Sequence, residues 1–254
     1  MGPEAGGPVN PLTATWEWFT TASNWSGPGG IPQRLWEHIQ YSAAALVIAA
    51  AIALPIGLVF GHLRKGASVA VAVSGVPRAI PTLGILVLLF PLAPVQFWPA
   101  LVALVILAVP PILANTVVGI EGVDPAVRDA AEGMGMRAGG VLFGVELPLG
   151  LALVVSGIRS STSQVIATAT VVAYGGLGGL GRFIIDGYST QNYGEVYGGA
   201  VLVAALALIA EGVLALLQRR ARRHRAPDSA RPTDTVAVGR QPADLRTATT
   251  DPVK

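Results

Sequence analysis

Residues 129–148 read DAAEGMGMRAGGVLFGVELP, and this stretch decides how the chain is organised. It opens with Asp129-Ala130-Ala131, reaches Gly135 after three intervening residues and closes on Leu147-Pro148. The surrounding segment 120–146 carries seven charged residues, whereas the segments on both sides of it are long and almost uncharged. A polar segment in this position indicates a structured loop between two helices that cross a membrane.

A short amphipathic helix is expected at the start of this loop. Asp124 is a good N-cap residue, and Pro125 suits the first helical position. Helical spacing then places a set of small and apolar side chains on one face: Ala126, Ala130 and Met134, with Val127 and Ala131 beside them. The charged side chains of the helix lie off that face, namely Arg128, Asp129 and Glu132.

The loop could pass the motion of a bound partner to the membrane helices. Gly133 and Gly135 end the first helix, and a second short helix is expected from Ala138 towards 146. Small alanines let a helix approach a partner closely, the charges around them fix its register, and Pro148 would tie its motion to the next span. The alternative is an ordinary amphipathic loop at the membrane surface.

Composition places the chain in a membrane. Of its 254 residues, 52% are hydrophobic and 13% are charged, against about 25% charged in soluble domains. Cysteine is absent and the three histidines are scattered, so no metal site is expected. The sequence has no Gly-x-x-x-x-Gly-Lys-Ser/Thr pattern, so no ATP site is expected on this chain. The first 33 residues lack Lys and Arg and a compact apolar run, so no cleavable signal is expected.

Five membrane-spanning helices are expected. They cover residues 39–61, 67–90, about 99–119, about 147–173, and 198–217. The second span is interrupted by Arg78, and three prolines between 91 and 99 mark the turn that follows it.

The positions of Lys and Arg predict the orientation. With the C-terminus in the cytoplasm, 13 of the 17 basic residues lie inside, which follows the positive-inside rule. The N-terminus then lies outside. Three regions follow: an external interfacial segment 1–38, a transmembrane domain 39–218 with the loop 120–148, and a cytoplasmic tail 219–254 that is basic and then disordered.

Four of the five tryptophans precede the first span, at positions 16, 18, 25 and 36. Their amphipathic rings suit the lipid headgroup level, so residues 12–37 are expected to lie on the membrane. The alternative is that these rings form the core of a small external cap.

Polar side chains at membrane depth are candidates for a translocation path. Arg78 and Arg159 could line the path and attract a substrate carboxylate, or an arginine could pair with Glu211 and lock two helices together. Gln164 and Thr168 share a helix face, where they could line the path or bond between helices.

Four stretches, at 78–84 (RAIPTLG), 110–116 (PPILANT), 123–148 and 157–181, give the chain a family resemblance. The chain resembles the permease subunits of type I ABC importers, and within them those for glycine betaine, carnitine and choline. The resemblance covers about residues 38–218. The family's loop motif has Glu where Asp129 stands and Ile where Val145 stands, so the match at these two positions is conservative rather than identical.

The resemblance implies an all-α membrane protein with five spans, cytoplasmic coupling helices and no catalysis of its own. Residues that would couple it to an ATPase are Asp124, Asp129, Ala130, Ala131, Glu132, Gly135, Leu147 and Pro148. The implied partners are a cytoplasmic ATPase that holds ATP and Mg, a second identical or homologous permease subunit, a separate external binding protein and membrane lipid, but no nucleic acid. No cofactor is expected on this chain.

The implied cargo is a quaternary-ammonium solute such as glycine betaine, carnitine, choline or proline betaine. Such a cation is recognised by aromatic faces, for which Tyr174 is the best-placed residue, although Tyr near a membrane boundary is also a common interfacial anchor. The alternatives are an ABC permease for methionine or taurine, an ion-coupled secondary transporter, and a membrane scaffold that transports nothing.

Overall fold

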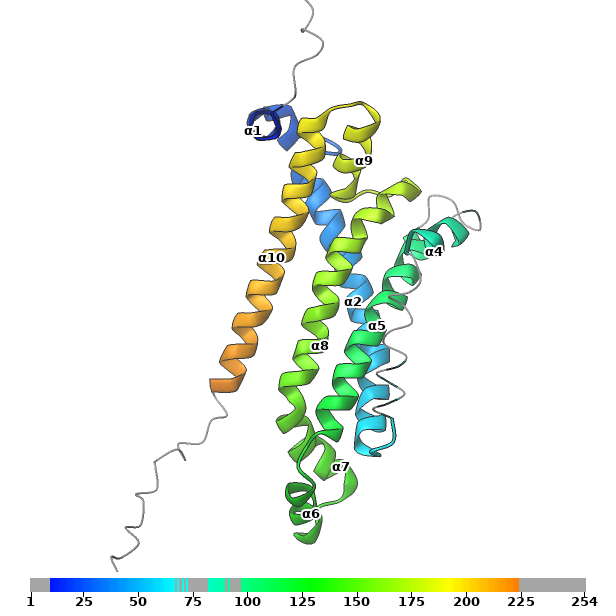
Figure 1. The fold of residues 1–254 in the computed structure, drawn as a ribbon, viewed down its shortest axis with the longest axis vertical. Coiled ribbons are helices and arrows are strands. Elements are labelled where there is room, and N and C mark those ends of the chain that lie inside the picture. The colour runs from blue at the N-terminus through cyan, green and yellow to red at the C-terminus, as the bar shows by residue number, and fades with distance from the viewer. Residues whose placement is uncertain are drawn as a thin grey trace, which may run out of the picture.

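Four long helices run side by side along the molecule (Figure 1). They are α2 (Ile31–His62), α5 (Phe97–Glu121), α8 (Leu147–Thr168) and α10 (Tyr193–Arg223). The computed structural model describes residues 10–66, 68, 70, 72, 82–89, 91 and 97–223, and these residues form helices and turns with no strand among them.

Each long helix has a stretch apolar enough to cross a membrane. Four of the five expected spans are thereby confirmed, each lying within or close to one helix. The second expected span lies mostly outside the described residues, apart from isolated positions and α4 (Thr82–Leu89). Arg78 and the tail 226–254 also lie outside them.

Small residues allow α2 to pack closely on α5. Five of them recur every fourth position and are buried, namely Ala45, Ala49, Ala53, Gly57 and Gly61. A Cβ atom at Gly57 would lie 2.7 Å from the Cβ of Thr116 in α5, so only glycine fits there. Close backbone approach through small residues is how membrane helices gain packing energy, because lipid removes the usual hydrophobic drive between them. The opposite side of α2 is apolar and exposed, as a lipid-facing surface must be.

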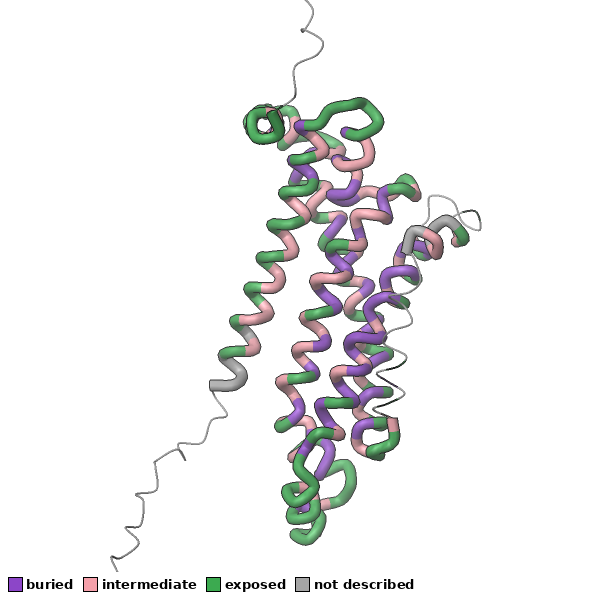
Figure 2. The backbone as a smooth tube through the Cα atoms, viewed as in Figure 1, coloured by how far each residue is buried: buried purple, intermediate pink, exposed green. Residues whose placement is uncertain are grey.

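The helix α8 lies against α5 and contacts α2 and α10 as well. Gly150 of α8 meets the backbone of Gly119 in α5, and Ser161 donates to the carbonyl oxygen of Ala108 at 2.8 Å. The buried His38 of α2 donates from Nε2 to the carbonyl oxygen of Ile166 at 3.0 Å. The buried residues accordingly concentrate where α2, α5 and α8 meet, whereas α10 is mostly exposed or half-buried (Figure 2).

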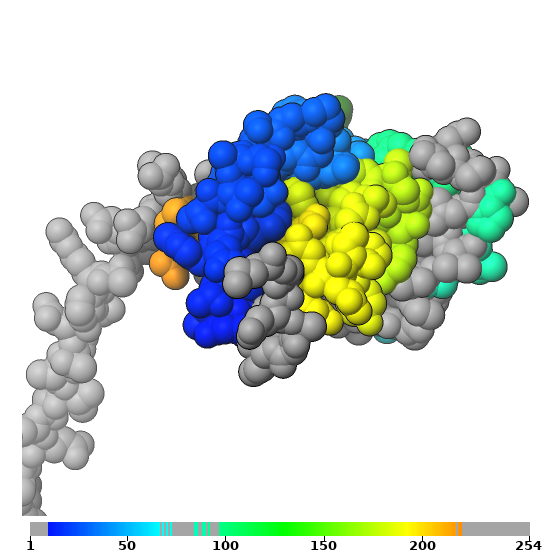
Figure 3. Space-filling view, turned by 90° about the horizontal axis from the view of Figure 1, so that it is seen from above, coloured from blue at the N-terminus to red at the C-terminus, as the bar shows by residue number. Residues whose placement is uncertain are grey.

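A small cap covers one end of the bundle. It consists of α1 (Pro11–Thr20), η1 (Ala22–Trp25), η4 (Ala169–Gly175) and α9 (Gly181–Ser189), and α1 lies beside the start of α10 (Figure 3). The Trp18 ring packs edge-on against Phe183, with centroids 5.1 Å apart, beside the buried Ile31 and Leu180.

The cap interpretation is therefore confirmed for one of the four tryptophans, and the membrane-surface interpretation stays a prediction for the others. Trp18 is a core residue of the cap, whereas Trp16, Trp25 and Trp36 are exposed. The helix α2 begins at Ile31, eight residues before the expected span at 39, because hydropathy marks only the apolar part of a helix that continues into the cap.

The other end of the bundle carries the loop between α5 and α8. It contains α6 (Pro125–Gly133), α7 (Ala138–Val141) and the π-helix η3 (Leu142–Glu146), which leads directly into α8. The cap and this loop thus lie at opposite ends of the molecule (Figure 1).

Candidate functional site

The helix α6 begins and ends where the sequence predicts. The Asp124 carboxylate accepts a hydrogen bond from the Ala126 backbone N–H at 2.9 Å, and Pro125 occupies the first helical position. The helix ends at Gly133, and Gly135 adopts a φ of +85°, which a residue with a side chain would rarely accept. These local signals fix a stiff helix of two and a half turns.

The apolar face of α6 points away from the rest of the chain. Ala131 is buried, but Ala126, Ala130 and Met134 are exposed, with 78% of Met134 accessible. The charged Asp129 and Glu132 are exposed beside them. A helix that shows both its small apolar residues and its charges to the outside is suited to contact a second protein.

A buried carboxylate joins α6 to the membrane helices. Glu146, at the end of η3, is 2% exposed. Its Oε2 lies 2.5 Å from Nδ1 of His62 at the end of α2, and its Oε1 lies 3.4 Å from Nη1 of Arg128 in α6. Nη1 of Arg128 also donates to the carbonyl oxygen of His62 at 3.0 Å.

We name Glu146, His62 and Arg128 the clamp. A buried carboxylate requires paired partners, because an uncompensated charge away from water is strongly unfavourable. The clamp therefore fixes the positions of α2, α6 and η3 relative to one another. The sequence analysis counted Glu146 among the loop charges but missed its partners, since His62 lies 84 residues away.

The outer side of Arg128 lines an open groove. Its Nε donates to Oε1 of Glu132 at 2.9 Å, and this bond raises the pKa of the Arg128 guanidinium above its usual value. The groove has a volume of about 600 Å³ and is lined by His62, Leu63, Arg64, Pro125, Arg128, Asp129 and Glu132. It mixes charges of both signs, so it offers polar contacts beside the apolar face of α6.

The helix is continuous from Ala138 through α8, so Pro148 does not start a separate segment. Proline lacks the N–H that an α-helix would use and crowds the carbonyl four residues before it. The wider turn of η3 lies directly before Pro148 and relieves this conflict. Leu147 and Pro148 are both half-buried in the first turn of α8.

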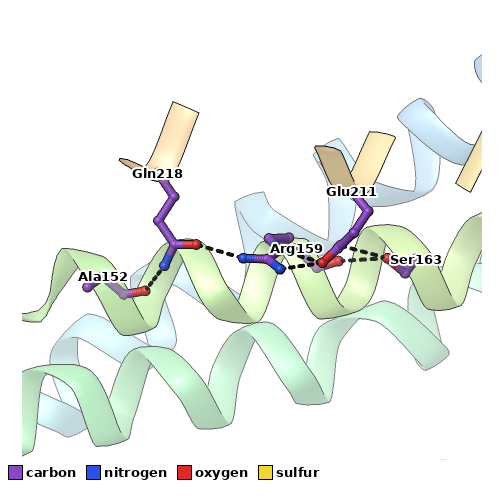
Figure 4. A network of polar contacts seen from close by, with 5 residues as sticks. All are labelled: Ala152, Arg159, Ser163, Glu211 and Gln218. Carbon is purple, nitrogen blue, oxygen red and sulfur yellow. Dashed lines mark hydrogen bonds and ion pairs between the residues drawn. The ribbon is translucent and has the colours of Figure 1, made fainter. Parts of the chain in front are cut away.

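A second polar network joins α8 to α10 (Figure 4). Arg159 pairs with Glu211, and its Nη1 donates to Oε1 of Gln218 at 3.0 Å. Ser163 donates to Oε2 of Glu211 at 3.1 Å, and Gln218 donates to the carbonyl oxygen of Ala152 at 3.0 Å. The predicted pairing of an arginine with Glu211 is thus confirmed. The sequence analysis missed Gln218, since one glutamine near the end of an apolar helix gives no signal of its partner.

The remaining candidates for the path are not brought together. Gln164 and Thr168 are half-buried on α8, whereas Tyr174 is 68% exposed in η4. By helical rise, Tyr174 lies roughly 25 Å further along the chain axis than Arg159. Tyr174 and Arg159 therefore do not belong to one compact site in this conformation.

Known proteins resemble both the sequence and the fold. The family described as "Binding-protein-dependent transport system inner membrane component" matches residues 53–223. The carnitine transport permease protein OpuCB of Listeria monocytogenes is 37% identical over 185 residues, which cover 73% of this chain and 85% of that protein. The choline transport system permease protein OpuBB of Bacillus subtilis (strain 168) is 36% identical over 192 residues, covering 76% and 88%.

Two solved structures share the fold. The inward-facing MetNI methionine ABC transporter superposes with a TM-score of 0.64 over 75% of this chain and 95% of that chain. An amino acid ABC transporter gives a TM-score of 0.60 over 84% of this chain and all of the other. Both share 20% sequence identity with this chain, so they support the architecture alone.

Proposed function

The chain belongs to the family of binding-protein-dependent transport system inner membrane components, and we propose that it is the permease of an ATP-driven importer of quaternary-ammonium solutes. The main support for this proposal is the 36–37% sequence identity to carnitine and choline permeases over most of their length. A third relative from Bacillus subtilis is a glycine betaine/carnitine/choline permease. Methionine or taurine is the less favoured cargo, because these relatives are permeases for carnitine and choline.

The helix α6 is the docking element for a cytoplasmic ATPase that binds ATP and Mg. Its exposed alanines permit close contact with the ATPase. The charged groove beside α6 would fix the position of the ATPase along the helix. Asp124 supports the helix from its N-terminus, and Gly135 ends it sharply. Asp129, Ala130 and Glu132 face outward and form the contact surface.

The clamp passes motion of α6 to the membrane helices. Arg128 sits on α6, while its two partners belong to the end of α2 and to the turn before α8. A displacement of α6 by the ATPase then moves the ends of two spans together. Leu147 and Pro148 continue this path into α8.

The proposed orientation has the N-terminus outside and the C-terminus in the cytoplasm. Arg64, Arg128 and Arg137 lie near the end of the bundle that carries α6, and α10 also ends towards that side (Figure 1). This clustering supports a cytoplasmic position for the loop. A separate binding protein would then deliver solute at the cap end, and a second identical or homologous permease would complete the pathway.

Arg159 acts as a structural link in this conformation rather than as a free carboxylate receptor. Its guanidinium is shared between Glu211 and Gln218. Gln164, Thr168 and Tyr174 remain the proposed path residues of this chain, together with Arg78.

Transport by the reconstituted system tests the proposal. The chain would be placed in liposomes with its ATPase and binding protein, and uptake of labelled glycine betaine, carnitine, choline and methionine would be measured with and without ATP. We expect ATP-dependent uptake of a quaternary-ammonium solute that methionine does not compete. Preferential methionine uptake would refute the cargo, and uptake driven by an ion gradient without ATP would refute the ABC mechanism.

A further inference from the structure

The helix α1 has two chemically different sides. Leu12, Trp16 and Phe19 follow helical spacing and border an apolar groove of about 480 Å³. Glu17, the only charged residue of α1, lines a different and more polar pocket with Asn24 and Asn192. A helix with one apolar and one polar side is suited to lie at a boundary between lipid and water.

The helix α1 is held firmly across the start of α10. A Cβ atom at Gly194 would lie 2.7 Å from the carbonyl oxygen of Ala14, so the two backbones touch. The Trp18 ring lies against Gly198 and packs on Phe183. In Figure 1 α1 is seen end-on while α10 runs along the long axis, so the two helices cross steeply. The groove is therefore a fixed feature of the fold.

The floor of the groove is the exposed flank of α10. Tyr197, Val201 and Ala204 line it below α1. Further along α10, Leu208 lies on the same face at helical spacing and is 72% exposed, so the apolar flank continues past the groove. That flank belongs to a helix that is long and apolar enough to cross a membrane, so we expect it to face lipid. The groove is open to it, and none of the described residues that line the groove is charged.

Trp16 marks the mouth of the groove. It is 71% exposed, and Leu12 one turn earlier is 81% exposed. Two large apolar side chains standing over a lipid-facing flank are unfavourable in water, whereas an acyl chain beneath them would cover both. A volume of this size lies within the range of small-molecule sites and is bordered almost wholly by apolar groups.

We propose that α1 and the start of α10 form a binding groove for one phospholipid acyl chain. The groove would lie in the membrane leaflet at the cap end of the bundle, opposite α6. The inference depends on the membrane location of α10 and is independent of the transported solute. The headgroup of that lipid would lie near the polar side of α1. The α1 side of the groove precedes the part of the chain that matches the family, 53–223, whereas the α10 side lies within it.

Tryptophan quenching tests the proposal directly. The full-length chain would be placed in liposomes of phosphatidylcholine, with or without bromine on the acyl chains, and its tryptophan emission compared. Trp16 is one of five tryptophans, so its loss in Trp16→Phe should remove about one fifth of the emission and should raise the fraction that survives bromine. Trp25→Phe is the matched control, because Trp25 lies outside the groove and its Nε1 donates to the carbonyl oxygen of Phe19 at 2.7 Å.

A second variant separates groove occupancy from mere proximity to lipid. Ala204→Leu fills the groove floor and leaves Trp16 in place, so it should weaken quenching by bromines placed deep in the acyl chain. If aqueous iodide quenches Trp16 and brominated lipid does not, the proposal is wrong and the face is left for a water-borne protein partner. If neither agent quenches Trp16, another copy of the chain covers it, and the proposal is equally wrong.

Discussion

Replacing Glu146 by Gln is the sharpest test of the clamp. The substitution keeps the size and shape of the side chain but removes its charge. Both partners stay in place, since Nδ1 of His62 is 2.5 Å from one carboxylate oxygen and Nη1 of Arg128 is 3.4 Å from the other. The change therefore probes the electrostatic part of the link between α6 and the spans.

The structure sets the expected magnitude. Glu146 is 2% exposed, and the side chains of His62 and Arg128 are 15% and 21% exposed, so solvent screens the clamp weakly. A hydrogen bond to a charged group contributes about 1.5–3 kcal/mol, and breaking a buried pair costs about 3–5 kcal/mol. We take about 3 kcal/mol for Glu146→Gln, which corresponds to about a hundredfold change in the population of the clamped state.

Glu132→Gln is the matched control. Glu132 bonds the same arginine, through Nε at 2.9 Å, but its side chain is 49% exposed. An exposed pair contributes about 0.2–1 kcal/mol, so this variant should stay close to the parent. The two substitutions thus remove the same chemical charge from two partners of one guanidinium in different surroundings.

The assay measures solute uptake and ATP hydrolysis in the same liposomes. Loss of the clamp should lower uptake per ATP by at least about tenfold while hydrolysis continues, because the ATPase still docks on α6 but its motion no longer reaches α2 and α8. Glu132→Gln should keep the parent ratio. An unchanged ratio in a folded Glu146→Gln protein would refute the coupling role of the clamp. Equal losses of uptake and hydrolysis would assign Glu146 to assembly instead.

Three further predictions concern other contacts. Asp124→Ala removes the N-cap of α6 and should destabilise that helix by about 1 kcal/mol, seen as weaker binding of the partner ATPase in a pull-down titration. Arg159→Met should lower the melting temperature in detergent, because it leaves Glu211 without its cationic partner. Combining Arg159→Met with Glu211→Leu should recover most of this loss. A melting temperature of the double variant below that of Arg159→Met alone would contradict the pairing. Gly57→Ala places a Cβ 2.7 Å from a side-chain atom of α5. It should lower the free energy of unfolding by about 1–3 kcal/mol, measured by thermal unfolding. Gly212→Ala is the control, because a Cβ there meets nothing within 4 Å, and it should be neutral or stabilising.

Local signals explain what the sequence predicted correctly. The bounds of α6 follow from an Asp-Pro start and a glycine stop within a few residues, which needs no knowledge of the rest of the fold. The four described spans follow from hydropathy in the same way. The Arg159–Glu211 pair was one of two open alternatives, because a charge at membrane depth must find a partner or a wet cavity.

Long-range geometry explains what the sequence missed. His62 and Glu146 are 84 residues apart, and neither stands in a motif that points to the other. Trp18 resembles its neighbouring tryptophans in sequence, and only the packing of α9 beneath it separates a buried ring from exposed ones. The length of α2 was underestimated because its first turns carry Arg34 and Glu37, which pair with each other at 3.1 Å in the cap.

The order of these contacts along the molecule explains how a single displacement could reach most of the described bundle. Pro148 alone is a weak link, because it lies within a helix that is already continuous and η3 before it absorbs the strain. The charged clamp is a stiffer link than Pro148, because the carboxylate of Glu146 in η3 is held by side chains from both α2 and α6. From α8 the Arg159 network carries the motion to α10, and the small-residue packing of α2 carries it to α5. If this path is right, Glu146→Gln should uncouple the movement of both α2 and α8 from the ATPase. Arg159→Met with Glu211→Leu should spare α2 and α8 and disturb α10 alone, a difference that spin labels on the ends of the three helices would measure.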